Sequence, residues 1–508
     1  MIRLGFLLFC LFWAVSISAQ NKQDYVWIFG DDQNSEEEGV QNLLFDFNKR
    51  SFEPRANTNA LEFDQNNVSI CNNQGELLYY SNGCAIANRE HKLLLNGDSI
   101  NAGPFFDILW RGDCSFGYPG LQDILLLEDP NNNDGYYLIT KPLEYEFNSG
   151  ISPSPIFLNY SYIDGTLDNG LGGVTIKNDN IFKADFLAAY LTAIQHINGQ
   201  DWWIIQPGRA DNIFYTFLLD ETGFKLMDNP SLGNVEFGDG SSASGRARFS
   251  PDGKLYAFYN VHDGLFLYDF DRETGEFDNF RTFDFIPFEG PKFSSIEFSS
   301  DSRFLYIAAT DSLWQVDLLE EDLNEGKELI DVYDGVPDPF YNGFISCALA
   351  PDCKIYVRGS SSSYSMHVIN NPNEKGKACN FVQRGLKLPL ISSVDTYPNV
   401  PRYRVDDEEK CDPSITTMFG EAVFYRRKLE LYPNPTRGPL RIDLPQDRSG
   451  VLYFFDMQGR EIQSPMNVSK NQTIDMLVHH WPVGMYNIEF IPDNQSDRLF
   501  WTGLVRKM

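Results

Sequence analysis

Clustered carboxylates are the side chains of this 508-residue sequence whose types and spacing could do chemistry. The densest cluster lies in the stretch DDQNSEEEG and comprises Asp31, Asp32, Glu36, Glu37 and Glu38. Carboxylates so close together repel one another, and a calcium ion would relieve that repulsion. The spacing does not match an EF-hand loop, and a solvated turn is the simpler interpretation. We therefore assign no cofactor and no metal site, and name these five residues as the candidates should calcium bind.

Catalytic motifs are missing from the sequence. It contains no GxSxG nucleophile elbow, no HExxH zinc motif and no CxxC pair. Three aspartates recur in turns between short apolar runs, where a carboxylate commonly accepts hydrogen bonds from the backbone: Asp252, Asp301 and Asp352. We therefore predict a protein without catalytic residues or enzymatic activity. A polysaccharide hydrolase or lyase that uses carboxylates from separate turns is the alternative.

Two adjacent tryptophans could bind a sugar. Trp202 and Trp203 lie in the apolar run QDWWIIQP, which has the composition of a strand. Neighbouring residues of a strand point to opposite faces, so we expect one ring in the core. The second ring is either also in the core or free to stack on a sugar.

The charge balance limits the partners of the protein. The formal net charge is -30, and it is concentrated before Arg426, after which basic and acidic residues are nearly balanced. A strongly acidic chain repels phosphate groups, so we expect neither nucleic acid nor an anionic membrane as a partner. The change in composition also predicts a domain boundary near Arg426.

The first 19 residues have the layout of a secretory signal peptide. Arg3 is followed by an apolar run from Leu4 to Val15 and then by small residues, which predicts cleavage between Ala19 and Gln20. The run is shorter than the ~20 apolar residues that span a bilayer, and no later segment is long and apolar enough. We therefore expect export of a mature chain without a transmembrane segment.

One disulfide is suggested by the cysteine positions. Cys71 and Cys84 flank a predicted hairpin, CNNQGELLYYSNGC, and the oxidising environment of an exported protein permits such a bond. Two separate buried thiols are the alternative, because cysteine spacing does not determine pairing.

A repeated β-strand unit organises the sequence up to residue 405. The clearest copy, ARFSPDGKLYAFYNVHDGLFLYDFDRETGEF, alternates short apolar runs with tight-turn signals. Similar units recur about every 50 residues, a period typical of β-propeller blades. The N-terminal stretch DYVWIFGDD supplies part of a further blade, which strands near LPLISSVDTYPNVPRYRV could complete. We favour seven blades, with six or eight as alternatives, over a set of β-sandwiches.

The sequences and the order of these units resemble those of a family of WD-repeat-like surface proteins of Bacteroidetes. The resemblance covers most of residues 25–405 and is carried by VWIFGDD, GELLYYSNGCAIANREHKLLLNG, YSYIDGTLDNGLGGV, LTAIQHINGQDWWIIQ and FSPDGKLYAF. This chain has Cys353 where the family often has a turn glycine. Members of this family mostly lack an assigned activity, so the resemblance implies a β-propeller and little about its ligand.

A second unit of short strands follows from Leu429 to the end of the sequence, and predicts a small β-sandwich. Its motifs resemble, in order, those of the type A sorting domain read by the Bacteroidetes type IX secretion system. The matching residues are Tyr432, Pro433, Asn434, Pro435, Gly438, Asp456, Gly459, Arg460, Gly484 and Tyr486. The resemblance implies transport across the outer membrane by that machinery, removal of the domain, and possible attachment of the remainder to surface lipopolysaccharide.

The sequence thus predicts an all-β protein with four parts: a signal peptide (1–19), a β-propeller (20–405), a linker (406–428) and a sorting domain (429–508). We expect it at the outer cell surface or secreted, as a binding or adhesion module for a glycan or a surface protein. A carboxylate-dependent hydrolase or lyase and a structural subunit of a surface assembly are the alternatives.

Overall fold

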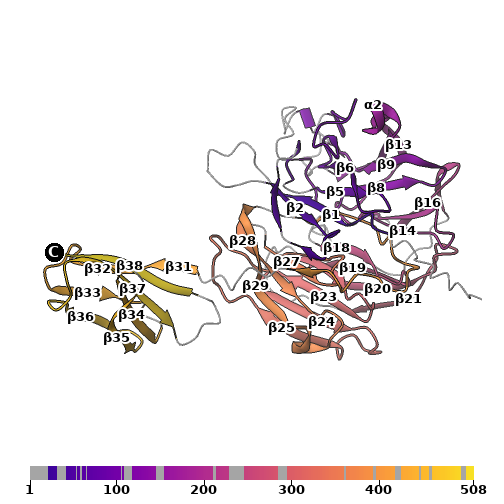
Figure 1. Cartoon of the computed structure of the whole chain (residues 1–508). Helices are drawn as coiled ribbons and strands as arrows, with labels where there is room; N and C mark the ends of the chain where they lie inside the picture. Colours follow the sequence, from indigo (N-terminus) through magenta and orange to yellow (C-terminus); the bar gives the residue numbers. More distant parts are fainter. Residues whose placement is uncertain are drawn as a thin grey trace, which may run out of the picture. The chain divides into compact units, whose positions relative to one another are not determined.

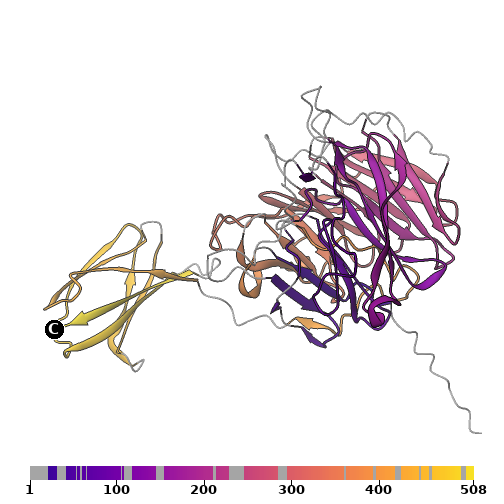
Figure 2. The same ribbon diagram turned by 90° about the horizontal axis from the view of Figure 1, so that it is seen from above.

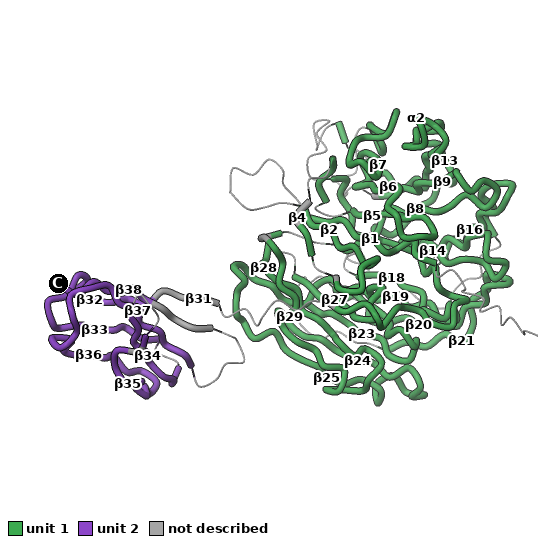
Figure 3. Tube along the Cα trace, in the orientation of Figure 1, with its two compact units in different colours: residues 1–418 green, residues 419–508 purple. Residues whose placement is uncertain are grey.

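The computed structural model describes residues 21–30, 42–52, 54–57, 60–63, 66–103, 106–107, 117–144, 154–209, 213–227, 245–261, 263–283, 294–359, 362–392, 396–417, 425–445, 448–456, 460–492 and 499–508. The chain divides into two compact units, Met1–Met418 and Phe419–Met508, which Figure 3 colours separately. Strands dominate both units. The described part of the first unit also contains the short helical turns α2 (Leu167–Gly170) and η1 (Gly376–Cys379).

Seven antiparallel sheets of three or four strands make up most of the described part of the first unit, and we number them in chain order. Sheet 1 contains β1 (Val26–Phe29), β2 (Asn42–Asp46) and β4 (Arg55–Asn57). Sheet 2 contains β5 (Val68–Cys71), β6 (Leu77–Ser81) and β7 (Ile86–Asn88). Sheet 3 contains β8 (Ile124–Asp129), β9 (Asn132–Thr140), β12 (Phe157–Asp164) and β13 (Gly173–Lys183). Sheet 4 contains β14 (Thr192–Gln195), β15 (Trp202–Pro207), β16 (Phe214–Asp220) and β17 (Gly223–Leu226). Sheet 5 contains β18 (Gly245–Phe249), β19 (Leu255–Asn260), β20 (Gly264–Phe270) and β21 (Phe277–Phe283). Sheet 6 contains β22 (Ser294–Phe298), β23 (Phe304–Ala309), β24 (Ser312–Asp317) and β25 (Lys327–Val332). Sheet 7 contains β26 (Ser346–Leu349), β27 (Ile355–Arg358), β28 (Ser363–Ile369) and β29 (Phe381–Ser392). Their order can be followed by colour in Figure 1 and, from above, in Figure 2.

Apolar clusters join each sheet to the next and then join the last sheet to the first. The closing cluster contains Trp27 of sheet 1 and Tyr356 of sheet 7, whose ring centroids are 6.5 Å apart. The indigo β2 and the orange β28 accordingly lie side by side in Figure 1. Because the ring closes, no sheet leaves an open face, and the unit is a seven-bladed β-propeller, as the repeat predicted.

The recurring turn between the first two strands of a sheet has the hydrogen bonding that we expected. Asp252, Asp301 and Asp352 each accept a hydrogen bond from the backbone N–H two residues ahead, at 3.2, 3.1 and 3.3 Å. The residue after each aspartate has a positive φ, which glycine adopts most easily. Ser302 and Cys353 adopt it in sheets 6 and 7 where sheet 5 has Gly253. These aspartates therefore shape turns.

Residues 396–417, which we call the axial strap, run past the innermost strands of the propeller. Asn399 donates hydrogen bonds to the carbonyls of Ile124 and Leu191, at 2.9 and 3.0 Å, and its N–H donates to Asn67 at 2.8 Å. These three partners belong to or adjoin sheets 2, 3 and 4. Arg402 forms a parallel bridge with Ile194 and an ion pair with Glu297 of sheet 6. The strap thus contacts many blades at once.

The strap ends firmly attached to the propeller. A disulfide joins Cys411 to Cys353, and β30 (Thr416–Thr417) pairs in parallel with β3 (Ser51–Phe52). Residues 406–417, which we expected in the linker, therefore belong to the first compact unit. The stretch expected to complete the first blade instead supplies β29 of sheet 7 and then the strap. The residues that the strap contacts are spread around the ring, so no local sequence pattern predicts these contacts.

The expected Cys71–Cys84 disulfide was wrong. Cys71 is a free, fully buried thiol, and Cys84 belongs to another disulfide. The two side chains lie in different apolar clusters, Cys71 beside Tyr80 and Cys84 beside Tyr118. A hairpin brings the ends of its strands together, but the strand faces decide which side chains meet.

The second unit is the predicted β-sandwich. One sheet contains β31 (Tyr425–Lys428), β38 (Leu499–Lys507), β37 (Gly484–Pro492), β34 (Gly450–Asp456) and β35 (Glu461–Val468). The other contains β32 (Glu430–Tyr432), β33 (Pro439–Asp443) and β36 (Thr473–Leu477). Leu431 and Ile442 of the smaller sheet share a core with Phe454 and Ile488 of the larger one. Among the residues that the structure describes, no helix could cross a membrane.

Candidate functional site

A large groove lies beside the axial strap in the described part of the propeller. Its volume is about 1810 Å³. Turns of sheets 5 and 6 and the end of the strap form its walls, principally residues 252–255, 269–272, 274–278, 301–303, 318–319, 405–406 and 410. A second hollow of about 830 Å³ shares Asp252, Asp301, Ser302 and Lys410 with it. We call the first hollow the groove and the second its extension.

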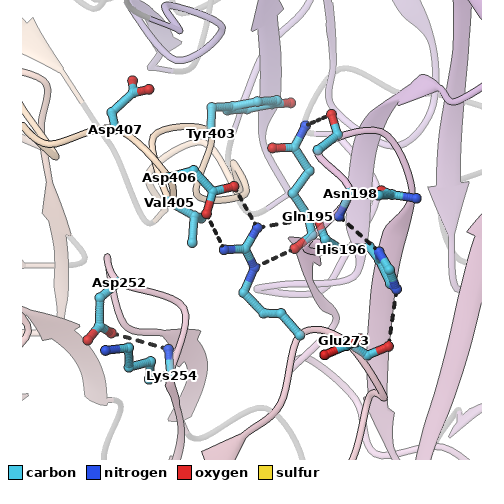
Figure 4. A network of polar contacts seen from close by, with 12 residues as sticks. Gln195, His196, Asn198, Asp252, Lys254, Glu273, Tyr403, Val405, Asp406 and Asp407 are labelled. Carbon is cyan, nitrogen blue, oxygen red and sulfur yellow. Dashed lines mark hydrogen bonds and ion pairs between the residues drawn. The ribbon is translucent and has the colours of Figure 1, made fainter.

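Arg272 fixes the strap to the wall of the groove. Figure 4 labels three of the residues that it contacts, Asp406, Gln195 and His196. The guanidinium of Arg272 donates to both carboxylate oxygens of Asp406, at 2.7 and 2.9 Å, and to the backbone oxygens of Gln195 and His196. The carbonyl of Arg272 accepts a hydrogen bond from Trp203 Nε1 at 2.8 Å. The bidentate contact from Arg272 lowers the pKa of Asp406. Sheets 4 and 5 and the strap therefore meet at one side chain.

Lys410 holds the other side of the strap. Its ammonium group donates to the carbonyls of Val405 and Asp407, at 2.5 and 2.7 Å. Partial burial lowers the pKa of Lys410, and the nearby carboxylates of Asp252 and Asp406 oppose that shift. The strap thus forms a compact loop at the groove instead of an extended tail.

Arg303, Asp269 and Arg281 line the groove and take part in ion pairs. Arg303 donates to both oxygens of Asp317, at 3.2 and 2.9 Å, and Lys375 contacts the same carboxylate at 3.1 Å. The Arg303 hydrogen bonds are the main cause that lowers the pKa of Asp317 to about 2. Arg281 pairs with Asp269 at 2.9 Å. These pairs hold long side chains in place, so the wall is pre-organised for contact.

The groove is moderately acidic, and its extension is more so. The acidic residues along the groove are Asp252, Asp269, Asp271, Glu276, Asp278, Asp301 and Asp406, and the basic ones are Lys254, Arg272, Arg281, Arg303 and Lys410. The extension adds Glu374, Glu408 and Glu409 without a further basic residue. Ile197 and Leu319 add apolar surface to the groove, with 56% and 73% of their surfaces exposed.

This arrangement is suited to binding. Four of the basic side chains on its walls already pair with carboxylates or backbone oxygens: Arg272, Arg281, Arg303 and Lys410. Within the described ranges, no group of three or more histidine, cysteine or carboxylate side chains is placed to hold a metal ion. His196 contacts the Glu273 carbonyl at 3.2 Å and accepts from the Asn198 N–H at 3.1 Å, so both ring nitrogens serve the loop.

The sequence missed this groove and suggested other residues. Both Trp202 and Trp203 are buried, with 0% and 1% exposure, so neither ring can stack on a sugar. Both faces of a propeller blade pack on neighbouring blades, and strand alternation therefore does not expose one of them. The five carboxylates proposed for calcium (Asp31, Asp32, Glu36, Glu37, Glu38) and the cleavage residues Ala19 and Gln20 lie outside the described residues.

In the sandwich, the opening sorting motif is tied to the last strand. Asn434 donates to the Leu504 carbonyl at 2.7 Å and accepts from the Arg506 N–H at 3.1 Å. Its neighbours Pro433 and Pro435 follow cis peptide bonds, and Tyr432 is half exposed. The motif residues therefore form a corner at the end of β32 that also fixes β38.

The remaining motif residues stabilise other corners of the sandwich. A side chain at Gly438 would place its Cβ 2.0 Å from the His479 ring, which explains the glycine. Asp456 accepts from the backbone and side chain of Arg460, at 3.0 and 2.7 Å. Gly459 lies outside the described residues. Gly484 begins β37, and buried Tyr486 donates to the Pro482 carbonyl at 2.6 Å.

Residues 430–498 match the model of a protein family described as the secretion system C-terminal sorting domain. The second unit is therefore a sorting domain, and the type IX secretion machinery handles this chain and exports it to the cell surface or beyond. No curated protein matches the sequence significantly.

Solved structures resemble the chain only distantly. A protein from Lactobacillus plantarum has 11% identity and a TM-score of 0.42, over 73% of this chain and 98% of that one. The periplasmic gluconolactonase of Pseudomonas aeruginosa has 12% identity and a TM-score of 0.39, over 73% and 98%. A quinoprotein alcohol dehydrogenase-like protein of Bacteroides thetaiotaomicron has 10% identity and a TM-score of 0.36, over 75% and 77%. At this distance, none of them transfers its activity to this chain.

Proposed function

We propose that the propeller is a non-enzymatic binding module displayed at the outer cell surface, and that the groove beside the axial strap takes its ligand. The observation that carries this proposal is the size of the groove, about 1810 Å³, together with walls whose charged side chains are held in ion pairs. A groove of this size accommodates a chain-like ligand better than a small metabolite.

The groove favours a neutral or basic ligand. The acidic side chains along the groove and its extension outnumber the basic ones, so a polyanionic glycan would be repelled. Ile197 and Leu319 offer exposed apolar contact to a sugar ring or an apolar side chain. The two ligand classes that remain are a neutral glycan and a surface protein.

The sorting domain would be removed by cleavage after export, and the axial strap limits the positions at which the chain can be cut. Cleavage before Cys411 would detach part of the strap from the disulfide that anchors it. Tyr425 already begins β31 of the sandwich. We therefore place processing between Thr417 and Tyr425, with the signal peptide cut between Ala19 and Gln20. Attachment of the product to surface lipopolysaccharide would follow.

The test is a binding screen with residues 20–417. This protein is presented to a panel of neutral and acidic polysaccharides and to outer-surface proteins, while the release of soluble products is monitored. We expect saturable binding to a neutral glycan or a protein without product release. Release of oligosaccharides would overturn the proposal in favour of a hydrolase or lyase.

A double variant locates the site. Replacing Ile197 and Leu319 with serine removes exposed apolar contact from the groove without touching its ion pairs. We expect the affinity to fall by roughly tenfold or more, as for loss of central apolar contacts in an interface. The matched control is Leu93→Ser, because Leu93 is 51% exposed and lies outside the groove. Equal affinity of the double variant and the wild type would place the ligand elsewhere.

A further inference from the structure

Buried positive charge gathers at the axis of the propeller between sheets 5 and 6. Arg246 and Arg248 lie two residues apart on β18, the innermost strand of sheet 5, and are 5% and 8% exposed. Arg402 of the axial strap reaches the same region, where its guanidinium contacts the Phe249 carbonyl and Glu297. Three guanidinium groups are thus withdrawn from water in a protein whose net charge is -30.

One carboxylate serves two of these guanidinium groups. Glu297 of β22 pairs with Arg402 and lies 3.6 Å from Nε of Arg248. It also accepts hydrogen bonds from the N–H groups of Phe298 and Leu349, at 2.9 and 3.1 Å. Glu297 therefore has no capacity left for a further cation.

The next carboxylate along the axis is also engaged. Asp123 lies 2.6 Å from Nζ of Lys141 and accepts a hydrogen bond from the Ala189 N–H at 2.8 Å. Lys141 donates in addition to the carbonyls of Leu187 and Ala189. Both members of this pair are almost fully buried, so the charge of Asp123, which also acts on Arg246, is already matched by the ammonium group of Lys141.

Among the residues that the structure describes, Arg246 has no hydrogen-bond or ion-pair partner for its guanidinium, and Nη1 is completely buried. Nε of Arg248 is also buried without a hydrogen bond. A buried charge without a counter-charge costs several kcal/mol, so native proteins pair such groups with a carboxylate or an ion.

The neighbouring groups that could become anionic stay neutral. Burial raises the pKa of Cys347, on the innermost strand of sheet 7, to about 12. Burial also raises the pKa of Tyr190, whose hydroxyl accepts a hydrogen bond from Asn260 at 3.1 Å. Burial lowers the pKa of Arg246 to about 9, and Arg248 adds to this effect. Arg246 is nevertheless charged at neutral pH, because that pKa still lies above 7.

We propose that Arg246 and Arg248 bind a small monovalent anion, a halide or a carboxylate, at the propeller axis. The anion accepts a hydrogen bond from Nη1 of Arg246, close to the charge of Arg248, and supplies the negative charge that Arg246 lacks. It joins sheet 5 to the axial strap, because Arg248 also donates to Asn399 Oδ1 at 3.1 Å. This site is formed by the inner strands and is independent of the ligand proposed for the groove.

The first test is thermal unfolding of the full-length exported protein at constant ionic strength. Chloride, bromide or acetate replaces a larger anion, gluconate, which serves as the reference. Because a ligand that binds only the folded state stabilises it, we expect the Tm to rise with the concentration of the small anion. The series also ranks the two anion classes, since a site that prefers carboxylates responds more strongly to acetate and a site that prefers halides responds more strongly to bromide.

The variant Arg246→Met removes the charge and keeps most of the apolar stem. We expect the anion dependence of its Tm to disappear, while the control Arg55→Met, an exposed arginine paired with Asp46, retains it. Equal anion dependence in the wild type and in Arg246→Met would overturn the proposal, because the anion would then act elsewhere.

A crystal of the wild-type protein grown with bromide provides a readout that does not depend on a variant folding. We expect an anomalous peak within ~3.5 Å of the Arg246 guanidinium, and its loss when excess acetate is added if the site prefers carboxylates. A water molecule at that position under both conditions would contradict the proposal.

Discussion

The sorting domain and the propeller differ in how their functional residues are distributed along the chain. The opening sorting motif runs from Tyr432 to Gly438, and one of its residues, Asn434, holds the final strand in place. The groove of the propeller takes Ile197, Arg272 and Asp406 from widely separated segments. A sorting motif can therefore be recognised from short stretches of consecutive residues. A binding surface assembled from several blades can be recognised only in the folded structure.

The largest expected effect comes from deleting the axial strap together with the sorting domain. Ending the chain at residue 395 removes the axial strap, and with it the contacts of Tyr397, Asn399 and Arg402 along the axis. We expect this protein to lose cooperative unfolding or to unfold at a Tm lower by more than ~10 °C, because buried polar groups of several blades lose their partners. Circular dichroism during heating measures the change.

The matched deletion ends the chain at residue 417 and removes only the sorting domain. We expect the propeller's Tm to change little, since each unit has its own apolar core. If ending at 395 and at 417 gave the same Tm, the strap would be a passive tail and the boundary inferred between Thr417 and Tyr425 would be wrong.

The next effect concerns the anchor of the strap. Cys411→Ser opens a disulfide that joins residues 58 positions apart. We expect the free energy of unfolding to fall by about 3–4 kcal/mol, as chain entropy predicts for a loop of this length. Urea unfolding measures it. The variant Cys71→Ser changes a free buried thiol and is the control for the cost of a new hydroxyl; a smaller loss for Cys411→Ser than for this control would contradict the anchoring role.

In the sorting domain, a single side chain carries a comparable role. Asn434→Ala removes two hydrogen bonds to β38, and we expect the isolated transition of this domain to lose about 1–2 kcal/mol. The propeller transition should not move. Ser464→Ala, an exposed position of β35, is the control. Export in cells should decrease with Asn434→Ala alone; unchanged stability would mean that the motif serves recognition only.

Much of the fold was predictable because its determinants are local. The alternating apolar runs recur along the propeller, and the turns at Asp252, Asp301 and Asp352 recur in sheets 5, 6 and 7, where each turn closes within a few residues. The strap was not predictable as an axial element, because the stretch TYPNVPRYRV has no periodicity and its partners lie in distant blades. The groove was missed for the same reason, since Arg272 meets Asp406 only after the ring has closed.

A buried histidine gives the propeller a pH dependence. His367 Nδ1 accepts from the Arg384 N–H at 3.1 Å, so Nε2 carries the proton and donates to the Asn342 carbonyl at 2.8 Å. Burial lowers its pKa to about 3, with smaller effects from Arg384, Asp334 and Arg358. The unfolded state therefore takes up a proton near pH 6.5 that the folded state refuses, and stability is lost as the pH falls from 6.5 toward 3.

We expect this histidine to contribute a loss of about 1–2 kcal/mol between pH 6.5 and 5. His367→Gln should be less stable overall but should lack that part of the slope. The control is His479→Gln, which changes an exposed histidine of the sorting domain. Urea unfolding of the propeller at several pH values provides the measurement. Identical slopes in the wild type and His367→Gln would show that another group is responsible.

The smallest expected effect lies in the groove itself. Asp406→Asn weakens a pair in which Asp406 is 58% exposed, so the free energy of unfolding should fall by no more than about 1 kcal/mol. Asp185→Asn disrupts another exposed pair, with Arg209, outside the groove, and is the control. Urea unfolding should therefore hardly distinguish the two variants. A loss several times larger for Asp406→Asn would make the groove a structural element.

The central claim is that the propeller binds through the groove while the sorting domain only delivers it. The most direct measurement is equilibrium binding of one ligand from the polysaccharide and surface-protein panel to four proteins: the full chain, residues 20–417, and residues 20–417 carrying either Ile197→Ser with Leu319→Ser or the control Leu93→Ser. Our account predicts equal affinity for the first two and the control, and a loss of roughly tenfold or more for the groove variant. Binding that needs the sorting domain, or that is unchanged by the groove substitutions, would contradict it.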